Sequence, residues 1–459
     1  MKKLFYILMF LFPVAACPQQ NWYKSSPLDY MWMNIRNAGF SAGEAFYTSL
    51  AFSPSGQPYV AYQDYAYANK ATVMKFDGTN WVNVGNAGFS AADAYYTSLA
   101  FSPSGEPYVA YRDYGNARMA TLMKFDGTNW VNVGNAGFSA DSVNFTSLAF
   151  SPSEQPYVAY WDYGNSNKAT VMKFDGTNWV NVGTAGFSAE VAQCTSLAFN
   201  PSGQPYVAYK DYGNSAKATV MKFDGTNWVN VGNAGFSAGN AEYTSLAFSP
   251  SGQPYVAYGD DEKYGKATVM KFDGTNWVNI GTAGFSAGEA ENTSLAFSPF
   301  GQPYVAYMDK GNSYKATVMK FDGSNWVNVG NAGFSAGDAW YTSLAFNQSG
   351  QPYVAYKDNW NIGKVTVMKF DSVFVGINEQ QESRFSLYPN PVTEKITIET
   401  ADVIKESNLS IVNIESQELI AQKISGHKTI IDISNLPSGV YFVRVTNDRT
   451  VEVGKIIKQ

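Results

Sequence analysis

The chain has 459 residues and a formal net charge of −6, and its composition is 15% charged and 16% aromatic. Charged residues make up about 25% of a typical globular chain, and the aromatic content excludes a charge-rich disordered polymer. The acidic balance argues against nucleic acid as a partner. Two cysteines cannot build a disulfide framework, and the single histidine, His427, excludes histidine triads and histidine-ligated metals from most of the chain. We therefore expect no cofactor.

Residues 1–17 predict a signal peptide, because two lysines precede an apolar run that ends in small residues. The run is too short to span a bilayer, and no later stretch reaches 18 apolar residues. We expect an exported mature chain without a transmembrane segment. Residues 14–17 also resemble a lipobox, so lipidation of Cys17 is an alternative, although Pro18 is unusual after a lipidated cysteine.

A repeat of 49 residues follows the leader, marked by Trp32, Trp81, Trp130, Trp179, Trp228, Trp277 and Trp326. The sequence between these tryptophans is nearly copied, which excludes an ordinary pair of domains. Within one unit, β-forming runs alternate with turn residues, and no helical period occurs. The predicted strands of the first unit are residues 48–53, 59–62, 71–76 and 81–84, with a loop at residues 64–70.

Four short antiparallel strands, repeated seven times, predict an all-β fold with a seven-bladed β-propeller over residues 31–376. A stacked β-solenoid is the alternative, although its coils are shorter. The first strand, residues 31–35, copies a fourth strand, whereas the last repeat shows only its first three strands before residue 371. We therefore expect the N-terminal strand to complete the last blade and close the ring, with residues 373–375 as the alternative fourth strand.

One face of the predicted propeller carries nearly constant turns, and the other carries the variable second-to-third loops and links between blades. The residue before the repeated aspartate is Gln63, Arg112, Trp161, Lys210, Gly259, Met308 or Lys357. A changing, aromatic-rich surface on a constant frame is typical of binding loops, although drift at tolerant loop tips is the alternative. Aromatic rings beside Asp and Asn suit sugars. The ligand-binding candidates are Tyr65, Tyr114, Trp161, Tyr163, Tyr212, Trp340 and Trp360.

The repeated aspartates, one per blade, have two interpretations: a ring of calcium ligands, or caps that accept backbone N–H bonds within their own loops. We favour the caps and assign no metal site. The series is Asp64, Asp113, Asp162, Asp211, Asp260, Asp309 and Asp358. Cys194 stands where five other repeats carry Tyr or Phe, so we interpret it as a substitution rather than a nucleophile.

The turn at residues 76–81 loosely resembles the Asp-box of sialidase-type propellers, but its residue order departs from that motif. Sialidases also need an arginine cluster, and this propeller has only Arg36, Arg112 and Arg118. No catalytic residue is assigned. The alternative is a glycosidase or lyase that uses two loop carboxylates from neighbouring blades. These acids are Glu242, Asp261, Glu262, Glu289 and Glu291.

A polar linker is predicted at residues 377–384, and the composition changes after it. In residues 385–459, Ile and Val alternate with polar residues. This pattern predicts about seven strands of a small Ig-like β-sandwich. Three motifs, at residues 387–392, 436–445 and 455–458, resemble the type A C-terminal sorting domain of the type IX secretion system. The motif residues are Tyr388, Pro389, Asn390, Pro391, Gly439 and Tyr441. An ordinary Ig-like adhesion module is the alternative.

The resemblance implies delivery to the surface or medium of a gram-negative bacterium, with the type IX translocon and a sortase-like peptidase as partners. It carries no information on the cargo. We therefore expect an exported propeller that binds a glycan or surface protein without catalysis through its variable loop face. A carbohydrate-cleaving enzyme and a ligand-free scaffold are the alternatives.

Overall fold

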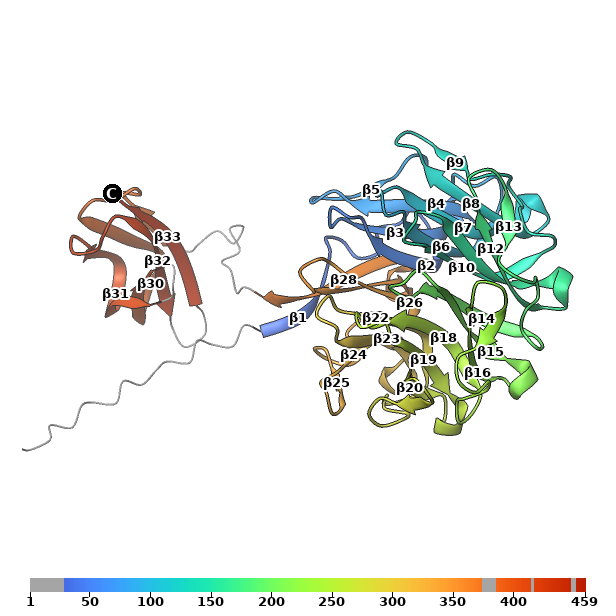
Figure 1. Cartoon of the computed structure of the whole chain (residues 1–459). Coiled ribbons are helices and arrows are strands. Elements are labelled where there is room, and N and C mark those ends of the chain that lie inside the picture. Colours follow the sequence, from blue (N-terminus) through green and yellow to red (C-terminus); the bar gives the residue numbers. More distant parts are fainter. Residues whose placement is uncertain (1–28, 374–384, 414–416, 447–450) are drawn as a thin grey trace, which may run out of the picture. The chain divides into compact units, whose positions relative to one another are not determined.

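The computed structural model describes residues 29–373, 385–413, 417–446 and 451–459 (Figure 1). The chain divides into two compact units, one up to Ser372 and one from Val373 onward. The expected signal peptide, Cys17 and the linker at residues 377–384 lie outside the described residues. Among the described residues, no helix combines the length and the apolar character needed to cross a membrane.

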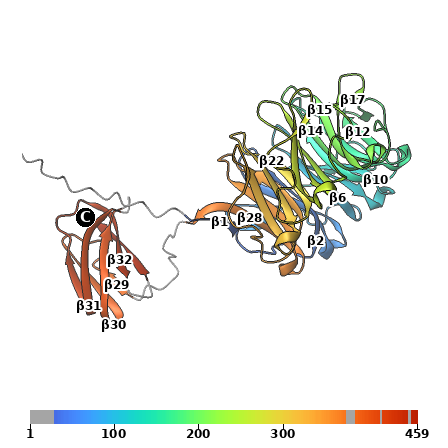
Figure 2. The ribbon, with the colours of Figure 1, turned by 90° about the horizontal axis from the view of Figure 1, so that it is seen from below.

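The first unit is a seven-bladed β-propeller, as predicted. Seven separate four-stranded antiparallel sheets surround one axis (Figures 1 and 2). The first strand of each blade contacts the first strands of both neighbouring blades, and the contact of β26 with β2 closes the ring. These first strands are β2 (Ala45–Phe52), β6 (Ala94–Phe101), β10 (Val143–Phe150), β14 (Ala192–Phe199), β18 (Ala241–Phe248), β22 (Ala290–Phe297) and β26 (Ala339–Phe346).

The second and third strands form the middle of each sheet, and the second strands are buried along most of their length. The second strands are β3 (Pro58–Asp64), β7 (Pro107–Asp113), β11 (Pro156–Asp162), β15 (Pro205–Asp211), β19 (Pro254–Asp260), β23 (Pro303–Asp309) and β27 (Pro352–Asp358). The third strands are β4 (Lys70–Phe76), β8 (Met119–Phe125), β12 (Lys168–Phe174), β16 (Lys217–Phe223), β20 (Lys266–Phe272), β24 (Lys315–Phe321) and β28 (Lys364–Val373).

The outer strand of blade 7 comes from the N-terminal end of the propeller. The fourth strands of blades 1–6 are β5 (Trp81–Asn83), β9 (Trp130–Asn132), β13 (Trp179–Asn181), β17 (Trp228–Asn230), β21 (Trp277–Asn279) and β25 (Trp326–Asn328). In blade 7, β1 (Asp29–Asn34) takes this place, because the sheet order is β1-β28-β27-β26. The predicted closure is therefore confirmed, and Val373 ends the third strand instead of forming a fourth.

Hydrophobic cores fill the spaces between neighbouring blades. In the core between blades 1 and 2, Val73 of one sheet packs with Leu99 and Trp130 of the next. The repeated tryptophan stacks on a phenylalanine of the preceding link, as Trp81 does on Phe40 with 4.2 Å between ring centroids. The sequence interpretation of tryptophan as a residue that packs between blades is therefore confirmed.

Every predicted strand of the first unit differs from the structure by one to three residues at one end or both, and two of the differences have a clear physical reason. The first strand of blade 1 begins at Ala45 rather than at residue 48, because a β-bulge after Phe46 keeps the earlier residues in the ladder. The loop predicted at residues 64–70 contains a 3₁₀ turn. A single helical turn is too short to produce a periodic pattern in the sequence, so the sequence did not indicate it. These turns are η1 (Tyr65–Tyr67), η2 (Tyr114–Asn116), η3 (Tyr163–Asn165), η4 (Tyr212–Asn214), η5 (Asp261–Lys263), η6 (Lys310–Asn312) and η7 (Asn359–Asn361).

The second unit is a small β-structure around one core of aliphatic and aromatic side chains. It has five strands among its described residues rather than about seven, because two of them are long and broken by register shifts. The first half of β30 pairs with β29 and its second half with β32. The strands are β29 (Phe385–Tyr388), β30 (Lys395–Val412), β31 (Glu418–Asp432), β32 (Gly439–Thr446) and β33 (Val451–Lys458).

Candidate functional site

The variable loops lie together on one face of the propeller, which we call the loop face. It carries the 3₁₀ turns and the links between blades, which hydrogen-bond to each other, as Tyr65 does to the carbonyl of Glu44. The opposite face carries the constant turns. There Asp77 accepts backbone N–H bonds from Thr79 and Asn80 at 2.8 and 2.7 Å, and these bonds lower the pKa of the Asp77 carboxyl.

The repeated aspartates cap the 3₁₀ turns, as the favoured sequence interpretation predicts. Each accepts a hydrogen bond from the backbone N–H two residues later, as Asp113 does from Gly115 at 3.0 Å. In five blades the second carboxylate oxygen also binds an asparagine and a threonine, which are Asn116 and Thr121 in blade 2. Both carboxylate oxygens of these five aspartates are therefore occupied within their own blades. No cluster of three potential metal ligands occurs in the described part of the chain.

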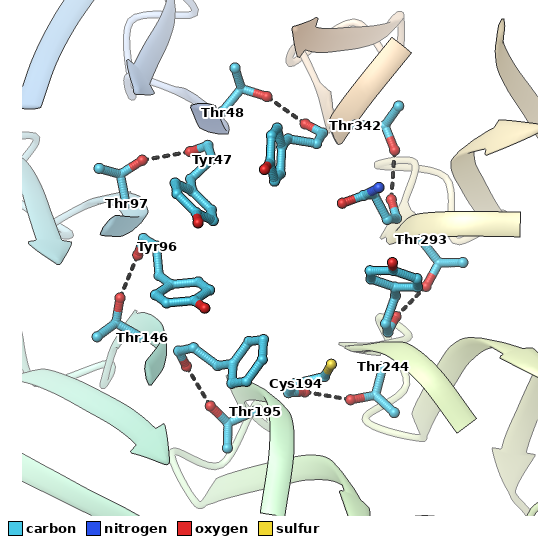
Figure 3. A pocket seen from close by; sticks show the side chains of 14 residues that line it. Tyr47, Thr48, Tyr96, Thr97, Thr146, Cys194, Thr195, Thr244, Thr293 and Thr342 are labelled. Carbon is cyan, nitrogen blue, oxygen red and sulfur yellow. Dashed lines mark hydrogen bonds between the residues drawn. The ribbon is translucent and has the colours of Figure 1, made fainter. Parts of the chain in front are cut away.

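The β-bulge in each first strand turns one side chain toward the propeller axis (Figure 3). In every blade the residue that carries this side chain has φ between 51° and 55°. This is a left-handed backbone conformation that residues other than glycine rarely adopt. We call these side chains the ring residues. They are Tyr47, Tyr96, Phe145, Cys194, Tyr243, Asn292 and Tyr341.

The ring residues and the threonines that follow them line a central pocket of about 290 Å³. Each threonine hydroxyl donates to the carbonyl of a ring residue in the preceding blade, as Thr97 does to Tyr47 at 2.5 Å, and seven such bonds close the circle (Figure 3). The pocket lies at the loop-face end of the axis, because the first strands begin there. These bonds fix the pocket wall independently of any ligand.

The wall of the central pocket is uncharged, and five of its fourteen residues are aromatic. Rings of neighbouring blades contact each other at centroid distances of 4.7–4.9 Å in the run Tyr341, Tyr47, Tyr96, Phe145. The four ring tyrosines have pKa values raised chiefly by burial, so their hydroxyls stay protonated. Burial raises the pKa of the Cys194 thiol to about 11, which agrees with its interpretation as a substitution rather than a nucleophile.

A second cavity opens on the loop face between blades 2 and 3, which we call the inter-blade cleft. Its volume is about 650 Å³. Three of the seven candidate ligand-binding residues line it, namely Tyr114, Trp161 and Tyr163. Two of the three propeller arginines, Arg112 and Arg118, line it as well. The remaining lining residues are Ala117, Asp141, Ser142 and Asn144.

Both arginines of the inter-blade cleft are held by neutral partners. Arg112 donates from Nη1 to Oδ1 of Asn144 in the next blade at 2.7 Å. Arg118 donates from Nη2 to the Tyr114 hydroxyl at 2.7 Å, and its guanidinium lies 4.8 Å from the centre of the Tyr114 ring. The Arg112 Nε and the Trp161 Nε1 are buried and have no hydrogen-bond partner.

Aromatic contacts connect the cleft to the central pocket. In blade 3 the ring of Phe145, which lines the pocket, lies 6.0 Å from the ring of Trp161, and Trp161 lies 6.0 Å from Tyr163. A parallel series starts at Tyr47 of blade 1 and continues through Tyr95 to Tyr114 of blade 2, with 5.9 and 5.8 Å between centroids. Two rows of rings therefore run from the axis toward the rim.

The other four candidates belong to other blades and line neither cavity. Tyr65 and Trp360 are largely exposed on the turns of blades 1 and 7. Tyr212 of blade 4 donates its hydroxyl to Gln193 at 3.1 Å. Trp340 of blade 7 stands on β26, beside Lys357 in the sheet register. Sequence reasoning missed the two arginines and the ring residues. The position before the constant threonine varies between blades, which marked the ring residues as variable but did not indicate that they turn toward the axis.

The acidic alternative site is largely neutralised within the chain. Glu242 forms an ion pair with the buried Lys210 of the preceding blade. Glu289 and Glu291 both bind Lys310, at 2.8 and 2.7 Å. These three carboxylates therefore face ammonium groups rather than an open site.

The three sorting motifs meet at one place in the second unit. The side chain of Asn390 accepts the backbone N–H of Ile457 at 2.9 Å and donates to the carbonyl of Lys455 at 2.8 Å. Tyr441 is buried and donates to the carbonyl of Pro437 at 2.7 Å. Strands β32 and β33 pair from Gly439 onward. The motif asparagine thus joins the first motif to the last strand, while Tyr388 remains exposed.

Residues 386–459 match the family model of the secretion system C-terminal sorting domain. A comparison of the whole sequence with curated proteins finds no significant match. The second unit is thus a sorting domain, and such a domain indicates secretion or location at the outer surface.

Several solved structures are similar to the chain at low identity. A polysaccharide lyase of family PL25, an ulvan lyase, is 11% identical with a TM-score of 0.49, and the match covers 72% of this chain and 94% of that one. A Penicillium chrysogenum α-L-arabinanase is 12% identical with a TM-score of 0.44, covering 74% and 98%. The Aleuria aurantia lectin is 16% identical with a TM-score of 0.43, covering 64% and 99%. The propeller assignment rests on the seven sheets themselves.

Proposed function

We propose that this chain is an exported propeller that binds a carbohydrate without cleaving it, and that the inter-blade cleft is the binding site. The observation that carries the proposal is the convergence of Tyr114, Trp161 and Tyr163 in one open cavity beside hydrogen-bonding side chains. Aromatic faces bind the C–H faces of a sugar ring, while amide, carboxylate and guanidinium groups bind its hydroxyls. A surface protein is the alternative ligand.

Two further observations support a binding role. The cleft walls come from neighbouring blades that a common core holds together, so the site is formed before the ligand arrives. Binding also suits the chemistry better than catalysis, because Glu242, Glu289 and Glu291 already bind lysines and are not presented as an acid and base pair.

A glycan array probed with the purified full chain tests the proposal. Tyr163 is exposed and its truncation leaves the core intact, so Tyr163→Ala should weaken glycan binding about tenfold or more. The control is Phe300→Ala, which removes an exposed ring from the opposite face and should change nothing. Absence of glycan binding, or equal binding by the Tyr163 variant, would refute the site. New reducing ends in polysaccharide digests would instead favour the enzyme.

We further propose that the type IX translocon recognises residues 385–459 and that a sortase-like peptidase processes the chain. The family match supports this route. Deletion of residues 385–459 should trap the propeller in the periplasm. A milder variant, Asn390→Ala, removes the two bonds to β33 and should reduce surface display. Normal display of the propeller at the cell surface after the deletion would contradict the proposal.

A further inference from the structure

The arginines of the inter-blade cleft differ from the lysines at the equivalent position of other blades. Lys210 and Lys357 stand where Arg112 stands, one residue before the capping aspartate, and each reaches the next blade. Both lysines are buried, and each binds a glutamate, Glu242 or Glu44. The chain itself therefore neutralises these two cations.

The side chain of Arg112 also extends to the next blade, but it donates a hydrogen bond to the neutral amide of Asn144. Asn144 occupies the position in its blade that Glu242 occupies two blades later. Arg118 meets a neutral phenol. Neither guanidinium forms an ion pair with any of the residues that the structure describes. A guanidinium is always charged and has five N–H donors, of which a single bond uses one. Two cations without an ion-pair partner among the described residues therefore line one cavity of a chain whose net charge is −6.

We propose that the ligand of the inter-blade cleft carries an anionic group, a carboxylate or a sulfate ester, which binds Arg112 and Arg118 while its sugar ring lies on the aromatic residues. This inference rests on the proposed carbohydrate site. Planar guanidinium groups bind such oxyanions through paired, charge-assisted hydrogen bonds. Arg36, the third propeller arginine, lines a separate cavity with Asp77 on the opposite face and takes no part.

Asp141 allows a separate test of the ligand's charge, because it is the one carboxylate that lines the cleft. Its Oδ1 accepts the N–H of Ser142 at 2.6 Å, and it forms no ion pair with either arginine. A bound anion would meet repulsion from this side chain. Asp141→Asn should therefore strengthen the binding of a charged ligand and leave the binding of a neutral one unchanged.

The test compares matched polymers that differ only in charge, with the purified full chain as the receptor. Dextran, carboxymethyl dextran and dextran sulfate form one set, and polygalacturonate and its methyl ester form the other. We expect at least one charged form to bind about tenfold more tightly than its neutral parent. Preference for carboxymethyl dextran and polygalacturonate identifies a carboxylate, and preference for dextran sulfate identifies a sulfate ester.

Two variants locate the preference in the cleft. Arg118→Gln removes a charge from an exposed turn, so folding is preserved, and it should abolish the tenfold preference, as should Arg112→Gln. Lys173→Gln removes the same charge on the opposite side of blade 3 and should have no effect. Equal binding of charged and neutral polymers, no binding of any charged polymer, or a preference that survives in both arginine variants would overturn the inference. If Tyr163→Ala weakens binding but charged and neutral polymers bind equally, the proposed carbohydrate site is supported and only the proposed anionic group of the ligand is refuted.

Discussion

The indole Nε1 of Trp130 donates a hydrogen bond of 2.7 Å to the carbonyl oxygen of Val84, across the boundary between blades 2 and 1. The same bond recurs at every boundary, and in blade 7 it runs from Trp32 to Val329. Each repeated tryptophan therefore fills the core and also satisfies a buried carbonyl of the preceding blade. The ring of blades is connected by polar as well as apolar contacts.

Trp130→Phe should lower the free energy of unfolding of the propeller by about 1–3 kcal/mol, because it leaves the Val84 carbonyl buried without its donor. Urea unfolding followed by circular dichroism measures the change. The matched control is Trp360→Phe, since Trp360 is 73% exposed, and its effect should stay within about 0.5 kcal/mol. Equal effects of the two substitutions would contradict the role assigned to the indole.

The capping aspartates provide a second prediction, because two blades lack a partner that five possess. The second carboxylate oxygen of Asp64 and of Asp260 is buried without a hydrogen bond, and burial raises the pKa of both groups. The position of the partner asparagine is occupied by Tyr67 or Lys263 in these blades. Tyr67→Asn should therefore stabilise the propeller by about 1 kcal/mol.

The reverse change tests the same bond. Asn214 donates to Asp211 at 2.8 Å, so Asn214→Ala should destabilise the propeller by about 1–2 kcal/mol in the same urea assay. An unchanged midpoint in both variants would show that the asparagine contributes nothing to the loop.

A third prediction concerns the left-handed backbone of the ring residues. Cys194 has φ of 53°, which glycine adopts freely and a β-branched residue adopts only with strain. Cys194→Val should therefore be less stable than Cys194→Gly by about 1–2 kcal/mol, although valine is the larger and more apolar residue. A valine variant as stable as the glycine variant would mean that the bulge relaxes readily.

The parts of the fold that sequence could predict are those that depend on period alone. The spacing of Trp81 and its copies specifies blade number, and the incomplete last repeat specifies closure by the first strand. The inward turn of Tyr47 could not be predicted, because a left-handed tyrosine contradicts backbone preference. The meeting of Arg112 with Asn144 depends on the register between two blades, which no local pattern contains. The register between blades also decides which of the seven aromatic candidates lie together. The sequence pattern therefore could not show that Tyr114, Trp161 and Tyr163 share one cleft.

The Cys194 thiol allows a fourth prediction, because its pKa of about 11 leaves roughly one thiol in a thousand ionised at pH 8. Alkylation by iodoacetamide should therefore be slow in the native protein and should rise about tenfold per pH unit from pH 7 to pH 9, where the propeller stays folded. Denaturation should accelerate the reaction at pH 8. A Cys17→Ser background removes the other cysteine as a source of signal. Rapid native alkylation at pH 7 would show that the thiol is activated.

The fifth prediction follows from seven buried tyrosines, one on the second strand of every blade, each at most 1% exposed. They are Tyr62, Tyr111, Tyr160, Tyr209, Tyr258, Tyr307 and Tyr356. Burial raises the pKa of each phenol above the ordinary value of 10.0, and the neighbouring capping aspartate raises it further. The folded protein therefore holds these protons more tightly than the unfolded chain does.

Stability from this source is fully present below about pH 10 and is lost as the pH rises above it, because only the unfolded chain then releases the phenolic protons. Each tyrosine should lower the free energy of unfolding by about 1.4 kcal/mol per pH unit in that range. Urea midpoints measured at pH 9, 10 and 11 should fall steeply, and tyrosinate absorbance should appear together with unfolding. Ionisation of these tyrosines in a protein that keeps its native circular dichroism would contradict their burial.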